Sequence, residues 1–118
     1  MIFETHAHYE DEAFDQDRKE LLESLPKNNI EYVVNISSGF KTVEASIELA
    51  QAYEYIYASV GIHPGDSLDM NEEKLLWLEE KAMHPKVVAV GEIGLDYYWD
   101  TPDRDTQRVW FAKQMEMA

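Results

Sequence analysis

Short apolar runs recur along the chain at regular intervals. Each run is rich in β-branched residues and mostly continuous rather than alternating, which is typical of strands buried on both faces of a parallel sheet. The runs lie at residues 2–3, 32–36, 56–60 and 87–90. They begin 24 to 31 positions apart, which is the length of a compact strand–helix unit. The spacing therefore predicts four strands joined by helices.

Helical patterns occupy the intervals and follow the last strand. Apolar residues spaced three or four positions apart predict one amphipathic helix in each interval. The first three stripes are Phe14, Leu21, Leu22 and Leu25; Val43, Ile47 and Ala50; and Leu75, Leu78 and Ala82. A fourth helix over residues 103–118 carries Gln107, Phe111, Gln114 and Met115 at the same spacings. Thr42 and Asn71 are suitable N-caps for the second and third helices, and Thr101 with Pro102 is a suitable start for the fourth.

The alternation of strand and helix predicts an α/β fold with a parallel sheet and right-handed crossovers. No linker or low-complexity stretch divides the 118 residues, so we expect a single domain over residues 1–118. No apolar run approaches the roughly 20 residues of a membrane helix, and no basic segment leads into a long apolar stretch. We therefore expect a protein without signal peptide or membrane partner.

Charge and cysteine content narrow the chemistry. The net charge is −14, from 24 acidic and 10 basic residues, and the chain has no cysteine. Disulfides, thiolate metal sites and a cysteine nucleophile are excluded, which fits a cytoplasmic location. Such an acidic chain repels nucleic acid. If it acts on phosphodiesters, metal ions must supply much of the positive charge.

Polar side chains gather where the predicted strands end, the place of function in parallel α/β folds. His6 and His8 end the first strand and, being two positions apart, point to the same side. Glu92 directly follows the apolar fourth strand, where an unpaired carboxylate is poorly solvated. These three residues predict a divalent metal site. The alternative for Glu92 is a salt bridge to Arg104, Arg108 or a lysine.

Two further residues are candidates for substrate contact. His63 stands between a glycine-containing turn and Pro64 after the third strand, where its ring can face a phosphate or a carbonyl, or can satisfy loop backbone groups. Tyr97 begins an aromatic run that follows Glu92. Aromatic faces stack on splayed bases, although they also pack loops together.

Several motifs resemble the signatures of the TatD-type deoxyribonuclease family, within the amidohydrolase-like group. They are Phe3-Glu4-Thr5-His6-Ala7-His8, Gly61-Ile62-His63-Pro64, Gly91-Glu92-Ile93-Gly94-Leu95-Asp96-Tyr97 and the Gln107, Phe111, Gln114 spacing. The resemblance implies a TIM barrel, of which this (βα)4 chain is about half, since such barrels have about 250 residues. It also implies a metal-dependent hydrolase of phosphodiester bonds that uses DNA as substrate, with 3′→5′ exonuclease activity in some members.

The resemblance also assigns roles to individual residues. His6 and His8 match the paired ligands of one metal, Glu92 matches the catalytic carboxylate that bridges two metals, and His63 matches a histidine near the substrate phosphate. The family's other ligands come from later strands, so we expect weak or no activity from residues 1–118 alone. Imidazole and carboxylate ligands suit Zn, Mn, Fe or Ni, and Mg is also possible.

The sequence departs from the family pattern at two positions. Glu4 stands where aspartate is usual, and Gly65 stands where many members have histidine. The first change affects the residues that support the metal ligands, and the second affects contact with the substrate.

Two other functions remain as alternatives: an amidohydrolase that cleaves C–N bonds, and a non-catalytic half-barrel that serves as an assembly module. A half-barrel has open edges and exposes barrel-filling residues, for which Val34, Val60 and Val88 are the candidates. We therefore expect these 118 residues alone to self-associate.

Overall fold

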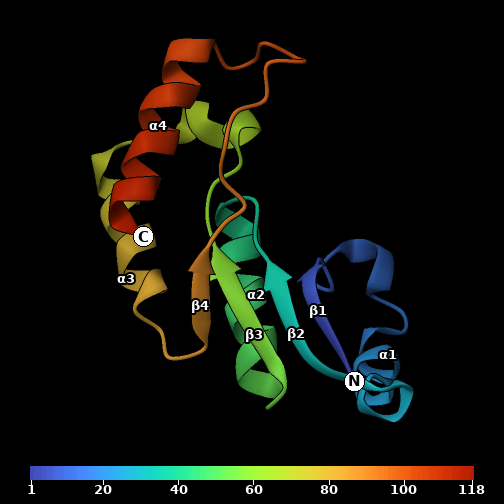
Figure 1. The fold of residues 1–118 in the computed structure, drawn as a ribbon. Helices are drawn as coiled ribbons and strands as arrows, with labels where there is room; N and C mark the ends of the chain where they lie inside the picture. The colour runs from blue at the N-terminus through green and yellow to red at the C-terminus, as the bar shows by residue number, and fades with distance from the viewer.

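The computed structural model describes all residues 1–118, and it contains one sheet of four parallel strands in the order β1-β2-β3-β4. The strands are β1 (Ile2–Ala7), β2 (Ile30–Ile36), β3 (Ile56–Val60) and β4 (Val87–Val90). Figure 1 shows the four arrows side by side and pointing the same way. The predicted α/β fold is confirmed. All the strand carboxyl ends consequently meet at one edge of the sheet.

Helical segments connect the strands and follow the last one. They are η1 (Glu12–Phe14), α1 (Arg18–Ser24), η2 (Pro26–Asn28), α2 (Phe40–Ala52), η3 (Pro64–Asp69), α3 (Glu72–Ala82) and α4 (Arg104–Met117). The predicted helix containing Phe14 is wrong in its first part: Phe14 ends a separate 3-10 turn and packs edge-on against Tyr9, with ring centroids 5.5 Å apart. No helix of the structure is long and apolar enough to cross a membrane.

The helix starts agree only in part with the predicted caps. Asn71 is the N-cap of α3, and its side chain accepts a hydrogen bond from the Lys74 amide at 2.8 Å. The cap of α2 is Gly39 rather than Thr42, whose hydroxyl lies inside the first turn and accepts from the Gly39 amide at 2.9 Å. Asp103, not Thr101, caps α4. Its hydrogen bonds from Thr106 lower the pKa of the Asp103 carboxyl.

The hydrophobic core lies between the sheet and its helices. Alternate strand residues point into it, together with one apolar stripe from each of α1, α2 and α3. The largest contributors are Leu22, Val33, Val43, Ile56, Val60, Ile62 and Leu78, all almost completely buried. Burying one such side chain stabilises the fold by about 1.5–3 kcal/mol. This core fixes the sheet, and with it the edge at which the candidate site residues meet.

The expectation of exposed barrel-filling residues is wrong for two of the three. Val60 is 0% exposed because it shares the helix-covered face of β3 with Ile56 and Ala58. Val34 is 8% exposed in β2, which β1 and β3 flank on both sides. Val88 is 54% exposed, as expected for the strand at the edge of the sheet.

The ends of β3 and β4 approach closely at two glycines. A Cβ added to Gly61 would lie 2.6 Å from the carbonyl carbon of Gly91, whereas a Cβ on Gly91 would meet nothing nearer than the Ser59 hydroxyl at 3.7 Å. Because backbone atoms rather than a flexible side chain fill the space beside Gly61, only glycine fits there. The contact holds the segment leading to Glu92 against the end of β3.

We predict that Gly61→Ala destabilises the chain by about 1–3 kcal/mol, the usual effect of forcing extra atoms into a packed interior. The matched substitution Gly91→Ala should have a clearly smaller effect. Chemical denaturation followed by circular dichroism measures both. Equal stability of Gly61→Ala and wild type would show that the approach of the two strands is not tight.

Candidate metal centre

The two histidine rings of the first strand end converge. His6 lies in β1 and His8 follows its last residue. Their Nε2 atoms are 3.2 Å apart, and the rings meet edge to face with centroids 5.0 Å apart. The pairing of β1 with β2 shifts register between Glu4 and Ala7, which is the part of β1 that contains His6. The predicted convergence of the two rings on one point is therefore present in the structure.

A backbone carbonyl orients His8. The Nδ1 atom of His8 lies 2.8 Å from the carbonyl oxygen of Ile36, at the end of β2. Because a carbonyl only accepts, Nδ1 carries the proton and donates it. In the neutral ring the Nε2 atom then keeps its lone pair. This arrangement presents His8 as a ligand through Nε2.

The longer side chain of Glu4 bends back toward its own strand. Its Oε1 atom accepts a hydrogen bond from the backbone amide of His6 at 3.0 Å. Glu4 thus supports the backbone of one histidine in this structure. Glu4 makes this bond at a position where the family that the sequence resembles usually has an aspartate.

A buried polar network that sequence reasoning missed lies beneath His8. The side chain of Glu10 is only 5% exposed, and its Oε1 atom is 3.7 Å from His8 Nδ1. Asn35 donates to Glu10 Oε2 at 2.6 Å and to the Ser46 hydroxyl at 2.9 Å, and it accepts from the Tyr9 amide at 2.7 Å. Two signals could have indicated it: Glu10 continues the two-residue spacing of the histidines, and Asn35 interrupts an apolar strand.

Arg18 holds the loop that follows the histidines. Its guanidinium donates to the carbonyls of Tyr9 at 2.6 Å, Glu10 at 3.1 Å and Asp11 at 2.7 Å, and to the Asp15 carboxylate at 2.7 Å. One side chain thereby fixes three consecutive backbone carbonyls. The loop beside the site is consequently held from α1, which begins at Arg18.

Glu92 reaches the histidines because the chain after β4 crosses toward the middle of the sheet. Its backbone amide donates to the carbonyl of Ser37, beyond β2, at 2.7 Å. Just before it, the carbonyl of Gly91 accepts from the Ser59 hydroxyl at 2.8 Å. These bonds bring Glu92 Oε2 to 3.7 Å from His6 Nε2. A carboxylate from the fourth strand thereby meets a histidine from the first.

The predicted ligand atoms therefore lie together. One nitrogen each from His6 and His8 and one oxygen from Glu92 are all within 4.8 Å of one another. The alternative salt bridges are not formed, since Arg104 pairs with Asp100 and Arg108 pairs with Asp105. Two imidazoles and one carboxylate are a donor set that suits a divalent transition metal.

A polar basin of about 440 Å³ adjoins this cluster. It is lined by His8, Glu10, Asp11, Ser38, Thr42, His63, Asp66 and Glu92, none of them hydrophobic. His63 caps η3, and its Nδ1 atom accepts from the Gly65 amide at 3.0 Å. Its Nε2 atom then carries the ring proton. His63 thus accepts a hydrogen bond from the Gly65 backbone amide and also lines the basin.

Gly65 makes the His63 contact possible. A Cβ at this position would lie 3.1 Å from His63 Nδ1, which is tighter than ordinary packing. The departure from the family pattern at Gly65 thus leaves room for the histidine ring and its bond to the loop.

Tyr97 lies apart from the basin. The Arg104 guanidinium covers its ring at 4.5 Å, and hydrogen bonding to Tyr97 helps raise the pKa of Arg108, although Asp105 is the larger cause. Its neighbours Tyr98 and Trp99 are largely exposed. The structure therefore does not bring Tyr97 together with the other predicted residues.

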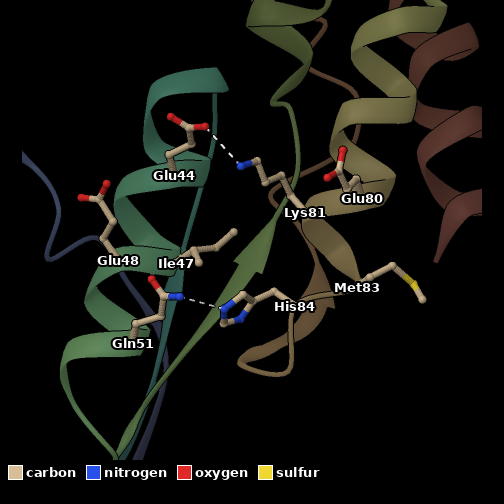
Figure 2. Close-up of a pocket in the computed structure, with 8 residues that line it drawn as sticks. All are labelled: Glu44, Ile47, Glu48, Gln51, Glu80, Lys81, Met83 and His84. Atoms are coloured by element: carbon tan, nitrogen blue, oxygen red, sulfur yellow. Dashed lines mark hydrogen bonds and ion pairs between the residues drawn. The ribbon is translucent and has the colours of Figure 1, made fainter.

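A larger groove, of about 510 Å³, lies between α2 and α3 on the helix layer (Figure 2). Lys81 pairs with Glu44 at 3.3 Å, and His84 lies 3.0 Å from the Gln51 amide across it. No set of converging ligands occurs there, since the one such group in the chain is His6, His8 and Glu92. The converging ligand candidates lie at the strand ends and not in this groove.

Comparisons with known proteins agree with this geometry. A family model described as TatD related DNase matches residues 3–118. The uncharacterized metal-dependent hydrolase YabD of Bacillus subtilis is 41% identical over 118 residues, which are 100% of this chain and 46% of that protein. The 3′-5′ ssDNA/RNA exonuclease TatD of Cronobacter turicensis is 27% identical, over 89% of this chain and 40% of that protein. The chain spans a little under half the length of these relatives.

Solved structures show the same relationship. The crystal structure of YjjV, a TatD homologue from Escherichia coli K12, superposes with a TM-score of 0.87 and 28% identity, over 99% of this chain and 46% of that one. A TatD-family hydrolase from Entamoeba histolytica shares the fold, with a TM-score of 0.83 over 98% of this chain. The four strand–helix units thus correspond to part of a TIM-barrel-like fold. The match over nearly all residues shows that the chain belongs to the TatD-related DNase family.

Proposed function

We propose that His6, His8 and Glu92 bind a divalent metal ion and form part of the active site of a phosphodiester hydrolase. The observation that carries this proposal is the placement of three ligand atoms, from two strand ends, within 4.8 Å of one another. The donor set suits Zn, Mn, Fe or Ni, with Mg also possible. A bound cation would supply Lewis-acid stabilisation to a phosphoryl group and increase the acidity of water.

The two histidines differ in which ring nitrogen is free to bind the metal. The carbonyl of Ile36 holds the proton of His8 on Nδ1, so His8 Nε2 is ready to bind. Without a cation, the 3.2 Å contact places the donated proton on His6 Nε2, because His8 carries its own proton on Nδ1. Binding requires His6 to carry that proton on Nδ1 instead. Its half-exposed ring allows water to accept the new hydrogen bond.

We propose single-stranded nucleic acid as the substrate class. The relatives include proteins named 3′-5′ ssDNA/RNA exonuclease and putative deoxyribonuclease. In this assignment the Nε2 proton of His63 faces a phosphate in the basin and Glu92 is the catalytic carboxylate. Tyr97 lies outside the basin, under the Arg104 guanidinium, and is assigned to a more distant part of the substrate. The basin carries several carboxylates and the chain has a net charge of −14. A cation is therefore needed before a phosphate can approach.

We also propose that residues 1–118 provide an incomplete site, with a second metal held by ligands outside this sequence. The chain matches 46% of YabD and 40% of TatD. Catalysis with two metals requires both ions in fixed positions, and small misplacements lower rates by about 10²-fold. An amidohydrolase acting on C–N bonds would use the same histidine pair, so substrate assays must include both bond types.

The first prediction from the proposed function concerns metal content. Wild-type chain incubated with Zn²⁺ and desalted should retain metal, because three donors converge, and the variant carrying both His6→Ala and His8→Ala should retain little. His84→Ala is the matched control, because that histidine lies in the groove between α2 and α3. Mass spectrometry of the native proteins measures the content. Equal content in all three proteins would remove the proposed site.

The second prediction concerns turnover. The 118-residue chain should hydrolyse a fluorescent single-stranded oligonucleotide with Mn²⁺ slowly or not at all, because part of the site is missing. Any turnover should disappear in Glu92→Gln, which keeps the shape of the side chain but removes its charge. Rapid turnover that depends on Glu92 would contradict the incomplete site, and turnover independent of Glu92 would contradict its catalytic role.

We further propose that these 118 residues alone self-associate through the edge of the sheet. An apolar groove of about 430 Å³ runs along β4, lined by Val87–Val90 with Ala82, Met83 and Met117. Burying apolar surface contributes about 25 cal/mol per Å². The charge of −14 opposes association, and salt weakens that repulsion.

The third prediction follows from this surface. Light scattering should show a mass that rises with protein and salt concentration, and Val88→Lys should reduce the association. Leu76→Lys, on the exposed side of α3, is the control with the same change at another exposed apolar residue. A monomer at every concentration, or an equal effect of the two variants, would argue against this interface.

A further inference from the structure

Two glutamines on α4 are buried without belonging to the candidate metal cluster. Gln107 and Gln114 are each 1% exposed and lie seven positions apart, on the same side of the helix. Burying an amide costs free energy unless its polar atoms are bonded. The residues to which these two amides bond therefore indicate why they are there.

Gln114 holds the loop that follows β3. Its Oε1 atom accepts from the backbone amide of Ile62 at 2.8 Å, and its Nε2 atom donates to the carbonyl of the same residue at 3.2 Å. The remaining Nε2 proton donates to the Trp110 carbonyl at 3.2 Å. Ile62 directly precedes His63. Both backbone groups of the residue before His63 are thus fixed by one side chain.

Gln107 makes the same kind of contact with the loop that follows β4. Its Oε1 atom accepts from the Asp96 amide at 2.8 Å, and its Nε2 atom donates to the carbonyls of Asp96 at 2.9 Å and Pro102 at 2.8 Å. Asp96 and Pro102, which flank residues 97–101, are thereby both bonded to the Gln107 side chain. That segment begins with Tyr97. In Figure 1 it rises beyond the strand ends before returning to α4.

Glutamine suits these positions for a chemical reason. A primary amide offers an acceptor and two donors, which match the N–H and C=O of one residue plus a further carbonyl. Methionine has a similar size but provides no N–H donor, and glutamate cannot donate to a carbonyl when ionised. Packing alone would be served by an apolar residue, so the amides indicate a need to fix these loops.

The other contacts of the loop that follows β4 come from Arg104, which covers the Tyr97 ring at 4.5 Å and pairs with Asp100 at 3.0 Å, and from the Asp96 side chain, which accepts from the Tyr98 amide at 3.2 Å. A Cβ placed on Gly94 would meet no atom within 4 Å, and Tyr98 and Trp99 are largely exposed. The metal-ligand candidates are anchored elsewhere, His8 by the Ile36 carbonyl and Glu92 by the Ser37 carbonyl. The two glutamines therefore bond these loops at Ile62, Asp96 and Pro102, and they do not contact the ligand candidates themselves.

We propose that α4 is a positioning helix, in which Gln114 sets the place of His63 and Gln107 sets the place of the loop that carries Tyr97. Both are positioning residues for the substrate side of the site. The substrate roles of His63 and Tyr97 rest on the proposed function, whereas the two backbone clamps can be tested without it.

Amide hydrogen exchange, followed by NMR on the 118-residue chain, tests the clamps. In Gln114→Met the Ile62 amide should exchange roughly tenfold faster, the effect of losing one buried hydrogen bond, while the Asp96 amide is unchanged. Gln107→Met should show the reverse. Gln51→Ala, which removes an exposed glutamine on α2, should alter neither amide. In wild type, the side-chain amide protons of both buried glutamines should exchange slowly.

This crossed pattern distinguishes positioning from general stability. If both amides accelerate together in each variant, or if a variant unfolds, the glutamines support the whole fold and the proposal is overturned. Rapid exchange of the wild-type side-chain amides would also overturn it, because it would mean that the bonds are not made.

A second arm tests the link to the substrate side, with Zn²⁺ and inorganic phosphate as probes. Both methionine variants should bind Zn²⁺ as wild type does in calorimetry. Phosphate added to the Zn²⁺-loaded chain should shift the NMR signals of the His63 ring in wild type and shift them less in Gln114→Met. Zn²⁺ binding without a shift in wild type would count against the phosphate role of His63 and not against the clamps. Weaker Zn²⁺ binding in the variants would contradict their separation from the metal ligands.

Discussion

The hydrogen bond from the Glu92 amide to the Ser37 carbonyl is the contact on which the candidate site depends. Glu92 follows the fourth strand, whereas the histidines belong to the first. In a flat sheet those two strands would be separated by the width of β2 and β3. The crossing of the chain toward β2, supported by the close approach at Gly61, brings the carboxylate to His6. The crossing of the segment after β4 therefore places side chains from distant strands at one point.

The acidity of the basin explains why the three converging ligand candidates would need a cation before a phosphate could bind. The Glu92 carboxylate, in a basin with the further carboxylates of Glu10, Asp11 and Asp66, would repel a phosphate. A divalent cation would lower the local negative charge, and it would bind the lone pair that the Ile36 carbonyl leaves on His8 Nε2 and that of His6 once its proton lies on Nδ1. The bound cation itself would then hold a phosphate oxygen in a basin that would otherwise exclude it. The proposed function thus follows from the donor set and its electrostatics, together with the family to which the chain belongs.

The sequence predicts most of the fold and the core of the site, because both follow from short-range patterns. Continuous apolar runs identified the four strands, and the polar residues at their ends identified His6, His8 and Glu92. The exposure of Val34 and Val60 was predicted wrongly, because a continuous apolar run does not reveal which of its residues face the helices. Glu10, Arg18 and the partners of Gln107 and Gln114 were missed, because their roles arise from contacts between segments that sequence spacing does not encode. Thr42 was misplaced as a cap because its hydroxyl lies in the first turn and accepts from the preceding amides of Ser38 and Gly39, whereas an N-cap side chain accepts from amides that follow it.

The most direct test of the account is a crystal structure of the chain grown with Zn²⁺, with diffraction data collected at the zinc absorption edge. We predict one strong anomalous peak about 2.0–2.1 Å from the Nε2 atoms of His6 and His8 and within bonding distance of the Glu92 carboxylate. The Nδ1 atom of His8 should remain hydrogen-bonded to the Ile36 carbonyl. Zinc peaks only at other surface residues, with the two histidine rings still bonded to each other, would contradict the central claim.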